Sequence, residues 1–364
     1  MCTDALVEIP ASIWRQALVP ATTDEGGRSP DLESAKAAIE LEPVDELTVT
    51  TVVDNFFDAN LADSAVAKRA GFGDVKRSRT PWMAEGANFD EPVAEHGFSA
   101  LVTMNKSGHT HHVLFDAGTS PDGAVENMRK LDISPSSIEA IVLSHGHFDH
   151  TTGLDGIART LGRPSQLPIV LHPEVFTRRR IAIKGKDPFE LPTLSRFAVE
   201  GMGFTIAEQK QPSFILDGSL LITGEVDRTT AFETGFPVHQ ALRSGHWEPD
   251  PLILDDQAVI ANIRGKGLMI ITGCGHAGIV NITRYARRLT GVEKVYAVIG
   301  GFHLGGPIFE PIIPHVTQEL AALEPAVIVP AHCTGWKATH ALAAKMENAF
   351  IQNSVGTKFI FSSS

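Results

Sequence analysis

The sequence is short of cysteine, of positive charge and of long apolar runs, and each shortage excludes a class of protein. Its 3 cysteines, Cys2, Cys274 and Cys333, are too few for a disulfide framework, which indicates a reducing compartment. Its 31 Lys and Arg stand against 43 Asp and Glu, a net charge of −12 that argues against nucleic acid or an anionic membrane as partner. No stretch reaches the length of a membrane span, and the N-terminus lacks the apolar core of a signal peptide. These absences predict a cytoplasmic protein that acts on a small molecule, as a monomer or a homodimer.

The chain divides into an extension and one large domain. Residues 1–45 mix Pro, Gly, Thr and acids, so we expect a loosely ordered extension with a short helix over 31–42. From residue 46 to 364, apolar and β-branched runs first follow one another as in hairpins and then alternate with helical patterns, which favours a layered α/β sandwich. The expected strands are 46–55, 97–104, 111–118, 138–146, 258–263, 266–273, 295–301 and 326–332. The expected helices are 120–133 with Ser120 as its cap, 151–162, 277–289, 313–323 and 335–350.

Residues 172–257 interrupt this alternation. The segment is rich in Pro, Arg, Glu and Asp and has no long periodic run, so we interpret it as an irregular insertion, a candidate lid or substrate-binding region. It also holds a basic run that either is a solvated face or binds a substrate anion. The basic residues of this run are Arg178, Arg179, Arg180, Lys184 and Lys186.

The stretch "SHGHFDH" at 144–150 directly follows an expected strand. Imidazole nitrogens and carboxylate oxygens are the ligands of zinc and related divalent ions. In an extended turn, residues two apart face the same way, so His145 and His147 can bind one ion while Asp149 and His150 approach a second. Neither pair completes a coordination sphere, so the pattern requires further ligands from elsewhere in the chain.

Three more histidines each follow an apolar strand and lie beside glycine: His276 in "TGCGHAG", His303 in "GGFHL" and His332 in "PAHCTG". Four strand ends that each deliver a histidine to one sheet edge predict a metal site. We expect one or two divalent ions, zinc above all, with manganese or iron as alternatives. His276 and His332 are the expected distant ligands. His303 is either a ligand, a group that orients one, or an acid–base group.

These residues resemble a known family. "HGHFDH" matches the HxHxDH signature of the metallo-β-lactamase superfamily, and Asp116 in "VLFDAG" matches the aspartate that supports its metal loop. Further segments resemble one branch, named after a dihydropterin synthase of methanopterin biosynthesis, a ribofuranosyl-aminobenzene phosphate synthase, over about residues 46–362. These segments are "VVDN" (52–55), "AEHGFSALV" (94–102), "GEVDRTTAFE" (224–233), "ILDDQAV" (253–259), "TGCGHAGIVN" (272–281), "GGFHL" (300–304) and "PAHCTG" (330–335).

The resemblance implies an αββα sandwich with the metals at one edge between two sheets. It assigns the first ion to His145, His147 and His276, and the second to Asp149, His150 and His332. Many relatives have an aspartate that bridges the ions after the strand that here ends in "VIGGFHL". That region is occupied here by Gly301, Phe302 and His303, none of which is a carboxylate. We therefore expect the chain to bind either one ion or two ions with unequal affinity.

The residues favour a metal-dependent hydrolase that uses metal-bound hydroxide on a small, anionic ester, phosphodiester or lactone. Asp149 would be both ligand and proton acceptor, His303 would donate a proton to the leaving group, and Asp116 would orient a ligand histidine. The alternatives are a metal-dependent synthase or lyase acting on a pterin or aminobenzoate-ribosyl phosphate, and a catalytically silent metal-binding sensor.

Candidate substrate residues flank this site, each with a structural alternative. His96 either contacts substrate or caps the edge of the core. Asp54 and Asn55 either contact substrate or form an ordinary turn. Arg228 is the preferred single reader of a phosphate. We interpret Cys274 and Cys333 as small buried residues rather than thiolate ligands.

Overall fold

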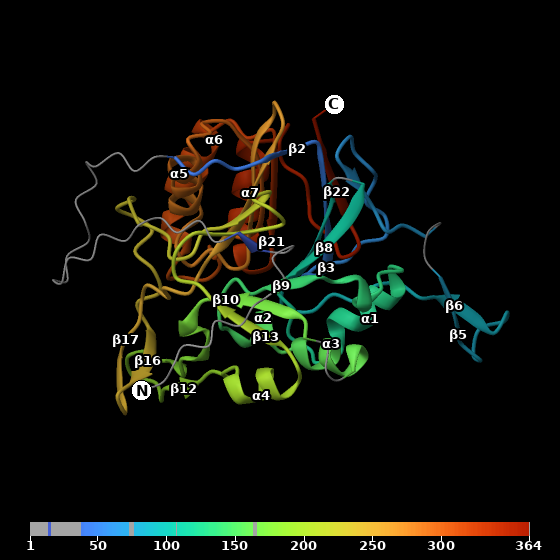
Figure 1. The fold of residues 1–364 in the computed structure, drawn as a ribbon, viewed down its shortest axis with the longest axis horizontal. Coiled ribbons are helices and arrows are strands. Elements are labelled where there is room, and N and C mark those ends of the chain that lie inside the picture. The colour runs from blue at the N-terminus through green and yellow to red at the C-terminus, as the bar shows by residue number, and fades with distance from the viewer. Residues whose placement is uncertain (1–13, 16–37, 73–75, 107, 163–165, 364) are drawn as a thin grey trace.

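The computed structural model describes residues 14–15, 38–72, 76–106, 108–162 and 166–363. The chain is arranged in four layers, with two β-sheets facing each other and helices on the outer side of each (Figure 1). This arrangement confirms the expected αββα sandwich.

The first sheet has eight strands among the described residues, in the order β13-β10-β9-β8-β7-β3-β22-β4. The pairs β8–β9, β9–β10 and β10–β13 are parallel, whereas β7–β8 and β3–β7 are antiparallel. Its strands are β3 (Glu46–Val53), β4 (Ala67–Lys68), β7 (Ser99–Lys106), β8 (His109–Phe115), β9 (Ala140–Val142), β10 (Pro168–Leu171), β13 (Thr205–Glu208) and β22 (Lys358–Ser362).

The second sheet, also eight-stranded over the described ranges, has the order β1-β14-β15-β18-β19-β20-β21, with β2 beside β18. Strands β19, β20 and β21 are parallel. Its strands are β1 (Trp14–Arg15), β2 (Pro43–Val44), β14 (Ser213–Ile215), β15 (Leu220–Ile222), β18 (Ala258–Ile263), β19 (Gly267–Thr272), β20 (Val295–Gly301) and β21 (Val327–Ala331).

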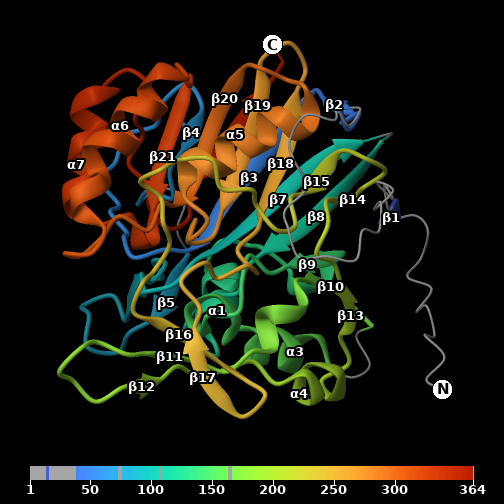
Figure 2. The same cartoon turned by 90° about the vertical axis from the view of Figure 1, so that its left-hand side faces the viewer.

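Helices cover the outer faces of both sheets (Figure 2). Those on the first sheet are α1 (Gly123–Lys130), α3 (Leu154–Leu161) and α4 (Arg196–Gly201), with the short α2 (Phe148–Thr151) at the sheet edge. Those on the second sheet are α5 (Ile279–Thr290), α6 (Ile313–Ala322) and α7 (Trp336–Lys345). Single 3-10 turns are η1 (Pro135–Ser137), η2 (Pro173–Phe176), η3 (Glu310–Ile312) and η4 (His332–Thr334). The expectation that Ser120 caps α1 is wrong, because the helix begins after Asp122 and the side chain of that residue makes no capping hydrogen bond.

Alternation along the strands builds three apolar layers. In β19, Met269 and Ile271 pack between the two sheets, while Leu268 and Ile270 pack under α5 to α7. Successive strand residues point to opposite faces, and here both faces are covered, so β19 is buried along its whole length. A third cluster fills the space between the first sheet and α1, α3 and α4.

Two segments differ from their sequence interpretation. The helix expected over 31–42 falls mostly outside the described residues, and its described part, 38–42, is not helical. There Leu41 is buried, and the Ile39 amide donates to the Leu289 carbonyl, so the chain joins the core before residue 46. The irregular insertion is narrower than 172–257, because β13, β14 and β15 belong to the large sheets.

Four strands of the segment 172–257 lie outside both large sheets and form a sheet of their own (Figure 2). It has the order β12-β11-β16-β17, and we call it the outer sheet. Its strands are β11 (Arg179–Ile181), β12 (Phe189–Glu190), β16 (His239–Arg243) and β17 (His246–Pro249). A separate hairpin pairs β5 (Arg77–Arg79) with β6 (Ala87–Phe89). Among the described residues, no helix is both long and apolar enough to cross a membrane.

Candidate metal centre

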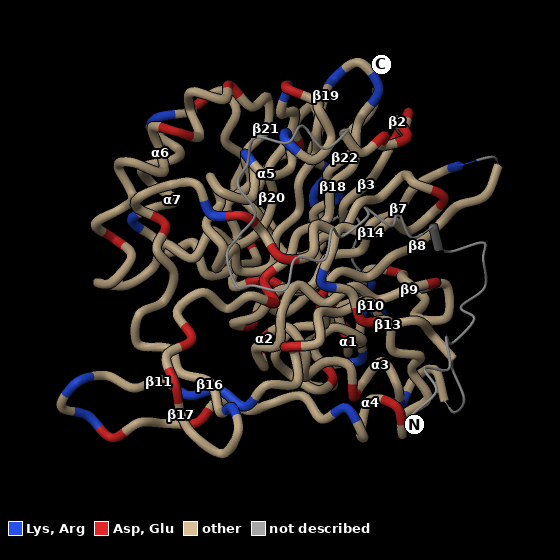
Figure 3. Tube along the Cα trace, turned by 60° about the vertical axis from the view of Figure 1, so that its left-hand side comes forward, with Lys and Arg blue, Asp and Glu red and all other residues tan. Residues whose placement is uncertain are grey.

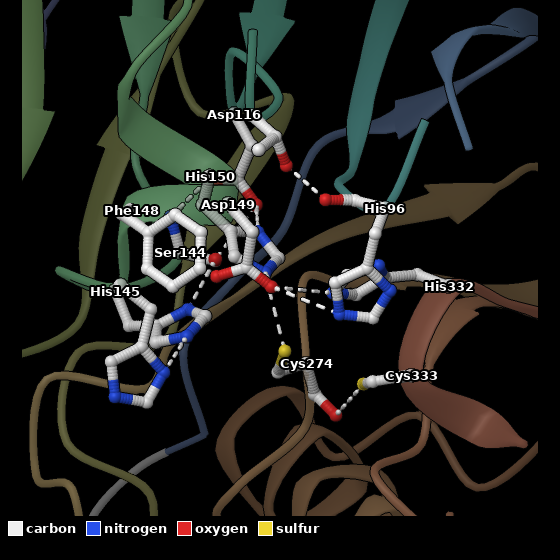
Figure 4. A network of polar contacts seen from close by, with 12 residues as sticks. His96, Asp116, Ser144, His145, Phe148, Asp149, His150, Cys274, His332 and Cys333 are labelled. Carbon is white, nitrogen blue, oxygen red and sulfur yellow. Dashed lines mark hydrogen bonds and ion pairs between the residues drawn. The ribbon is translucent and has the colours of Figure 1, made fainter. Parts of the chain in front are cut away.

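Strand ends bring the predicted ligands together at one edge of the sandwich (Figure 4). His145 and His147 lie in the turn after β9, and Asp149 and His150 lie on α2, which begins directly after His147. His276 follows β19, and His332 begins η4 directly after β21. Parallel strands end at the same edge of a sheet, which is why residues so far apart in sequence meet.

Three histidine nitrogens converge in a first group. His147 Nδ1 lies 2.9 Å from His145 Nε2 and 3.2 Å from His276 Nε2. Burial lowers the pKa of all three imidazoles well below the usual histidine value, so each ring is neutral at pH 7. Neutral imidazole is the form that binds a metal.

Aspartate, histidine and cysteine form a second group next to the first. Asp149 Oδ2 lies 3.2 Å from His332 Nε2 and 3.8 Å from His150 Nε2. Cys274 Sγ lies 3.2 Å from the same nitrogen of His150 (Figure 4). Burial alone would raise the pKa of Asp149, but His150 and His332 hold it well below its usual range, so the carboxylate is ionised.

Asp116 lies at the end of β8 and fixes the turn that carries the histidines. Its Oδ1 accepts from the Ser144 amide at 2.7 Å, and its Oδ2 accepts from Ser144 Oγ and from His150 Nδ1, both at 2.7 Å. Burial would lower the pKa of His150, but the carboxylates of Asp116 and Asp149 raise it to about 9. Because Asp116 accepts the Nδ1 proton, Nε2 is the His150 nitrogen that faces Asp149 and Cys274, and it would become the metal donor on giving up its own proton.

Asp54, Asn55 and His96 surround His332. Asp54 Oδ1 accepts from the His332 amide at 2.7 Å and Oδ2 accepts from Asn353 Nδ2 at 2.9 Å, and burial raises the pKa of Asp54 to about 6. Asn55 Oδ1 lies 3.2 Å from His332 Nδ1, and its Nδ2 lies 3.0 Å from His96 Nδ1. His96 Nε2 in turn lies 3.8 Å from Asp149 Oδ2. The first two residues therefore orient His332, while His96 is exposed at the mouth of the site.

Arg228 does not present a free guanidinium. Its Nη1 donates to the His276 carbonyl at 3.0 Å and its Nη2 donates to the Leu252 carbonyl. These bonds use two of the five N–H groups of the guanidinium, and the expectation that Arg228 reads a substrate phosphate stays a prediction. Arg228 also fixes the loop that carries His276.

The first two arginines of the basic run at 178–186 form ion pairs within the protein, and Figure 3 shows basic and acidic segments side by side around β11, β16 and β17. Arg179 is buried, and its Nη1 donates to Asp255 Oδ2 at 2.9 Å. The same carboxylate oxygen accepts from the Gly146 amide at 2.8 Å. A Cβ at Gly146 would lie 2.3 Å from the Val175 carbonyl oxygen, so only glycine fits between the two metal-facing histidines.

His239 of the outer sheet is a site residue that the sequence reasoning missed. It is fully buried, its Nε2 lies 3.0 Å from His147 Nε2, and its Nδ1 lies 3.2 Å from the Asp250 carbonyl oxygen and 3.5 Å from Asp250 Oδ2. Burial would raise the pKa of Asp250, but His239, Arg179 and Arg243 lower it to about 2. His239 follows no strand end and no glycine, so its sequence context "FPVHQAL" carried no signal.

His303 lies beside a cavity of about 130 Å³ that opens next to the first group. The ring centroid of His303 lies 4.2 Å from that of His276 and 4.6 Å from that of Phe309. The side chains of Phe232 and Phe302 complete an aromatic wall. The lining also includes Glu233 and Thr234, and a cavity of this size matches one six-membered ring.

The residues present fit divalent metal ions. His145 Nδ1 lies 2.9 Å from Ser144 Oγ, whose proton goes to Asp116, so His145 Nε2 carries a lone pair. His147 Nε2 faces His239, which leaves a lone pair on His147 Nδ1. These two lone pairs point at one another at 2.9 Å, an arrangement that is repulsive without a cation between them. The roles of the individual residues as ligands remain predictions.

Comparison with known proteins agrees with this geometry. Residues 94–289 match the family model of the metallo-beta-lactamase superfamily, and the chain belongs to this superfamily. It is 32% identical over 287 residues to the 7,8-dihydropterin-6-methyl-4-(beta-D-ribofuranosyl)-aminobenzene-5'-phosphate synthase of Methanocaldococcus jannaschii, which covers 76% of this chain and 95% of that protein. An uncharacterized protein of the same organism is 29% identical over 276 residues, 75% of this chain and 96% of that protein. The resemblance to the methanopterin branch is thereby confirmed.

A solved structure supports the fold. It is described as a metal-dependent hydrolase of the beta-lactamase superfamily, and it matches with a TM-score of 0.63 at 22% identity over 86% of this chain and 98% of that one.

Proposed function

We propose that the chain is a metal-dependent hydrolase that acts on a small ester, phosphodiester or lactone. The observation that carries the proposal is the convergence of the lone pairs of His145 and His147 beside a second donor group built on Asp149. Divalent ions held there would activate a water molecule for attack and polarise the reacting oxygen of the substrate.

The chain's own residues have distinct tasks in this proposal. Asp149 is held ionised by His150 and His332 and accepts the proton of the attacking water. His303 lies at the cavity wall, where it donates a proton to the leaving group. With Arg179 engaged inside the protein, the negative charge of a substrate would be neutralised by the ions and, at a phosphate, by Arg228.

A second candidate is a synthase that acts on an aminobenzene ribosyl phosphate or a pterin. Two observations favour it: the relative with 32% identity is named as such a synthase, and the cavity beside His303 has aromatic walls and the volume of one ring. Both candidates use the same donor groups, so product analysis separates them and residue geometry does not.

The first experiment measures metal by elemental analysis in the unmodified protein, in His147→Ala and in His332→Ala. His340→Ala changes an exposed histidine on α7 and is the matched control. We expect about two zinc, manganese or iron ions per chain, fewer in both site variants and an unchanged content in the control.

The loaded protein is then assayed on phosphodiesters, lactones and aryl esters, and separately on a dihydropterin with an aminobenzene ribosyl phosphate. Hydrolysis that requires metal and is lost in His147→Ala supports the hydrolase. Turnover of the second substrate set alone supports the synthase. A protein that binds no metal after reconstitution contradicts both.

A further inference from the structure

Cys274 is common to three groups of possible metal donors, and two of them contain residues of the proposed metal centre. Its Sγ and the donor atoms of Asp149, His150 and His332 all lie within 4.8 Å of one another, and its Sγ forms a second such group with His145 and His276. Cys274 is 2% exposed, and its sulfur lies close to donors assigned to each of the two ions, His145 and His276 for the first and Asp149, His150 and His332 for the second. A donor common to both groups is positioned to contact both ions.

The orientation of His150 points to the sulfur as a ligand. His150 Nδ1 donates to Asp116 Oδ2 at 2.7 Å, so Nε2 is the nitrogen left to bind a metal, and it faces Cys274 Sγ at 3.2 Å. Donor atoms that share a tetrahedral zinc ion at bond lengths of 2.0–2.3 Å lie roughly 3.3–3.8 Å apart. The sulfur and this nitrogen are therefore already near the separation that a common ion requires.

Position 301, the last residue of β20, has no room for a side chain. A Cβ at Gly301 would lie 2.4 Å from the Gly273 carbonyl oxygen, 2.7 Å from Cys333 Sγ and 3.2 Å from Cys274 Cα. Position 301 is thus closed to a carboxylate by the backbone and side chains of the two cysteine loops, and Phe302 and His303, the other residues of this region, carry no carboxylate.

We propose that the Cys274 thiolate is a metal ligand shared by the two ion positions, in place of the bridging aspartate. The inference rests on the proposed metal centre. On metal binding the S–H bond breaks, the sulfur bonds the ions and the proton passes to solvent. Thiolate ligation favours zinc or iron over manganese or magnesium, so the proposal also narrows the choice of native metal to zinc or iron.

Cys333 is the matched control. Its Sγ donates to the Cys274 carbonyl at 3.4 Å, and its donor group contains Cys274 and His303 but none of Asp149, His150 and His145. A spectroscopic signal of sulfur bound to the metal ions should therefore depend on Cys274 and not on Cys333.

The test begins with X-ray absorption of the zinc-loaded, unmodified protein, which does not depend on any variant folding. With two ions per chain, a shared thiolate gives one sulfur per zinc at about 2.3 Å, whereas a ligand of one ion alone gives half of one on average. Half a sulfur per zinc overturns the sharing, and bound zinc with no sulfur overturns the ligation. Failure to bind zinc at all overturns the metal centre itself, which distinguishes the two proposals.

Cobalt-loaded variants then identify the sulfur. We expect the near-ultraviolet sulfur-to-cobalt charge-transfer band to disappear in Cys274→Ser and to persist in Cys333→Ser and Cys2→Ser, with circular dichroism confirming that each variant folds. Metal affinity of Cys274→Ser should fall by at least the roughly 10–100-fold typical of losing a group that supports a ligand. A band that persists in Cys274→Ser, or that disappears in Cys333→Ser instead, contradicts the assignment.

Discussion

His239 Nε2 and His147 Nε2 lie 3.0 Å apart, although 92 residues separate them in the chain. His239 reaches Asp250 through its other nitrogen, so a line of contacts runs from the first donor group through two histidines to an ionised carboxylate. A neutral ligand histidine is oriented by the partner of its second nitrogen, and the outer sheet supplies that partner here. This sheet therefore belongs to the metal centre.

Replacing His239 by Ala should weaken the binding of the ion at the first donor group. The variant removes the acceptor that fixes the His147 tautomer, so we expect metal affinity, measured by competition with a chelator, to fall about 10–100-fold. His246→Ala, an exposed histidine on the neighbouring strand β17, is the control and should bind as the unmodified protein does. Equal affinities in both variants would mean that His239 only fills space.

Replacing Arg179 by Ala should lower the free energy of unfolding much more than replacing Arg178 by Ala. Arg179→Ala leaves the carboxylate of Asp255 buried without its cation, so urea unfolding should show a loss of about 3–5 kcal/mol. Arg178 pairs with Glu190 at the surface, where an ion pair contributes less than about 1 kcal/mol. Similar losses in the two variants would contradict the structural role of Arg179.

The stability contributed by Glu233 should decrease as the pH rises. Its carboxyl accepts from the amides of Val280 and Asn281 at the start of α5, and burial raises its pKa from 4.5 to about 7. Between these values the folded state binds a proton that the unfolded state releases. The contribution is therefore full below pH 4.5 and is lost as the pH rises through 7.

Urea unfolding of the unmodified protein and of Glu233→Gln at pH 5 to 8 measures this effect. The difference in unfolding free energy, unmodified minus variant, should decrease with pH by up to about 3 kcal/mol, at about 1.4 kcal/mol per pH unit. A difference that stays constant across this range would show that the carboxyl has an ordinary pKa.

Adding one methyl group at Gly301 should destabilise the fold. The new carbon would lie 2.4 Å from the Gly273 carbonyl oxygen, and overpacking of this kind costs about 1–3 kcal/mol. Gly305→Ala is the control, because its Cβ would meet its nearest neighbour, the Cys333 carbonyl oxygen, at an ordinary 3.4 Å. Thermal unfolding of the two variants should separate them, and equal midpoints would mean that the β20 end has room for a side chain after all.

Local pattern was sufficient to predict most of the fold. The run "VYAVIGG" became β20 over the same seven residues, because β-branched and apolar residues with glycine at the end specify a buried strand. Helix 277–289 became α5, shifted by one or two residues at its ends. The ends of helices are predicted less accurately, as the failed assignment of Ser120 as a cap shows, because capping depends on the exact path of the chain.

The sequence by itself determined a layered α/β sandwich and the crowding of His145, His147, Asp149 and His150 in one turn, since both follow from residues that are neighbours in the chain. The αββα order of the layers was implied by the family resemblance. The three-dimensional structure decided which distant groups complete the site. His239 approaches His147, Arg179 pairs with Asp255, and Arg228 binds the backbone near His276. Each contact joins segments that are far apart in the sequence, and only the closure of the sheets sets the direction of their side chains. For the same reason Cys274, a small buried residue when read from the sequence, lies close to donors of both groups once β19 and α2 are brought together.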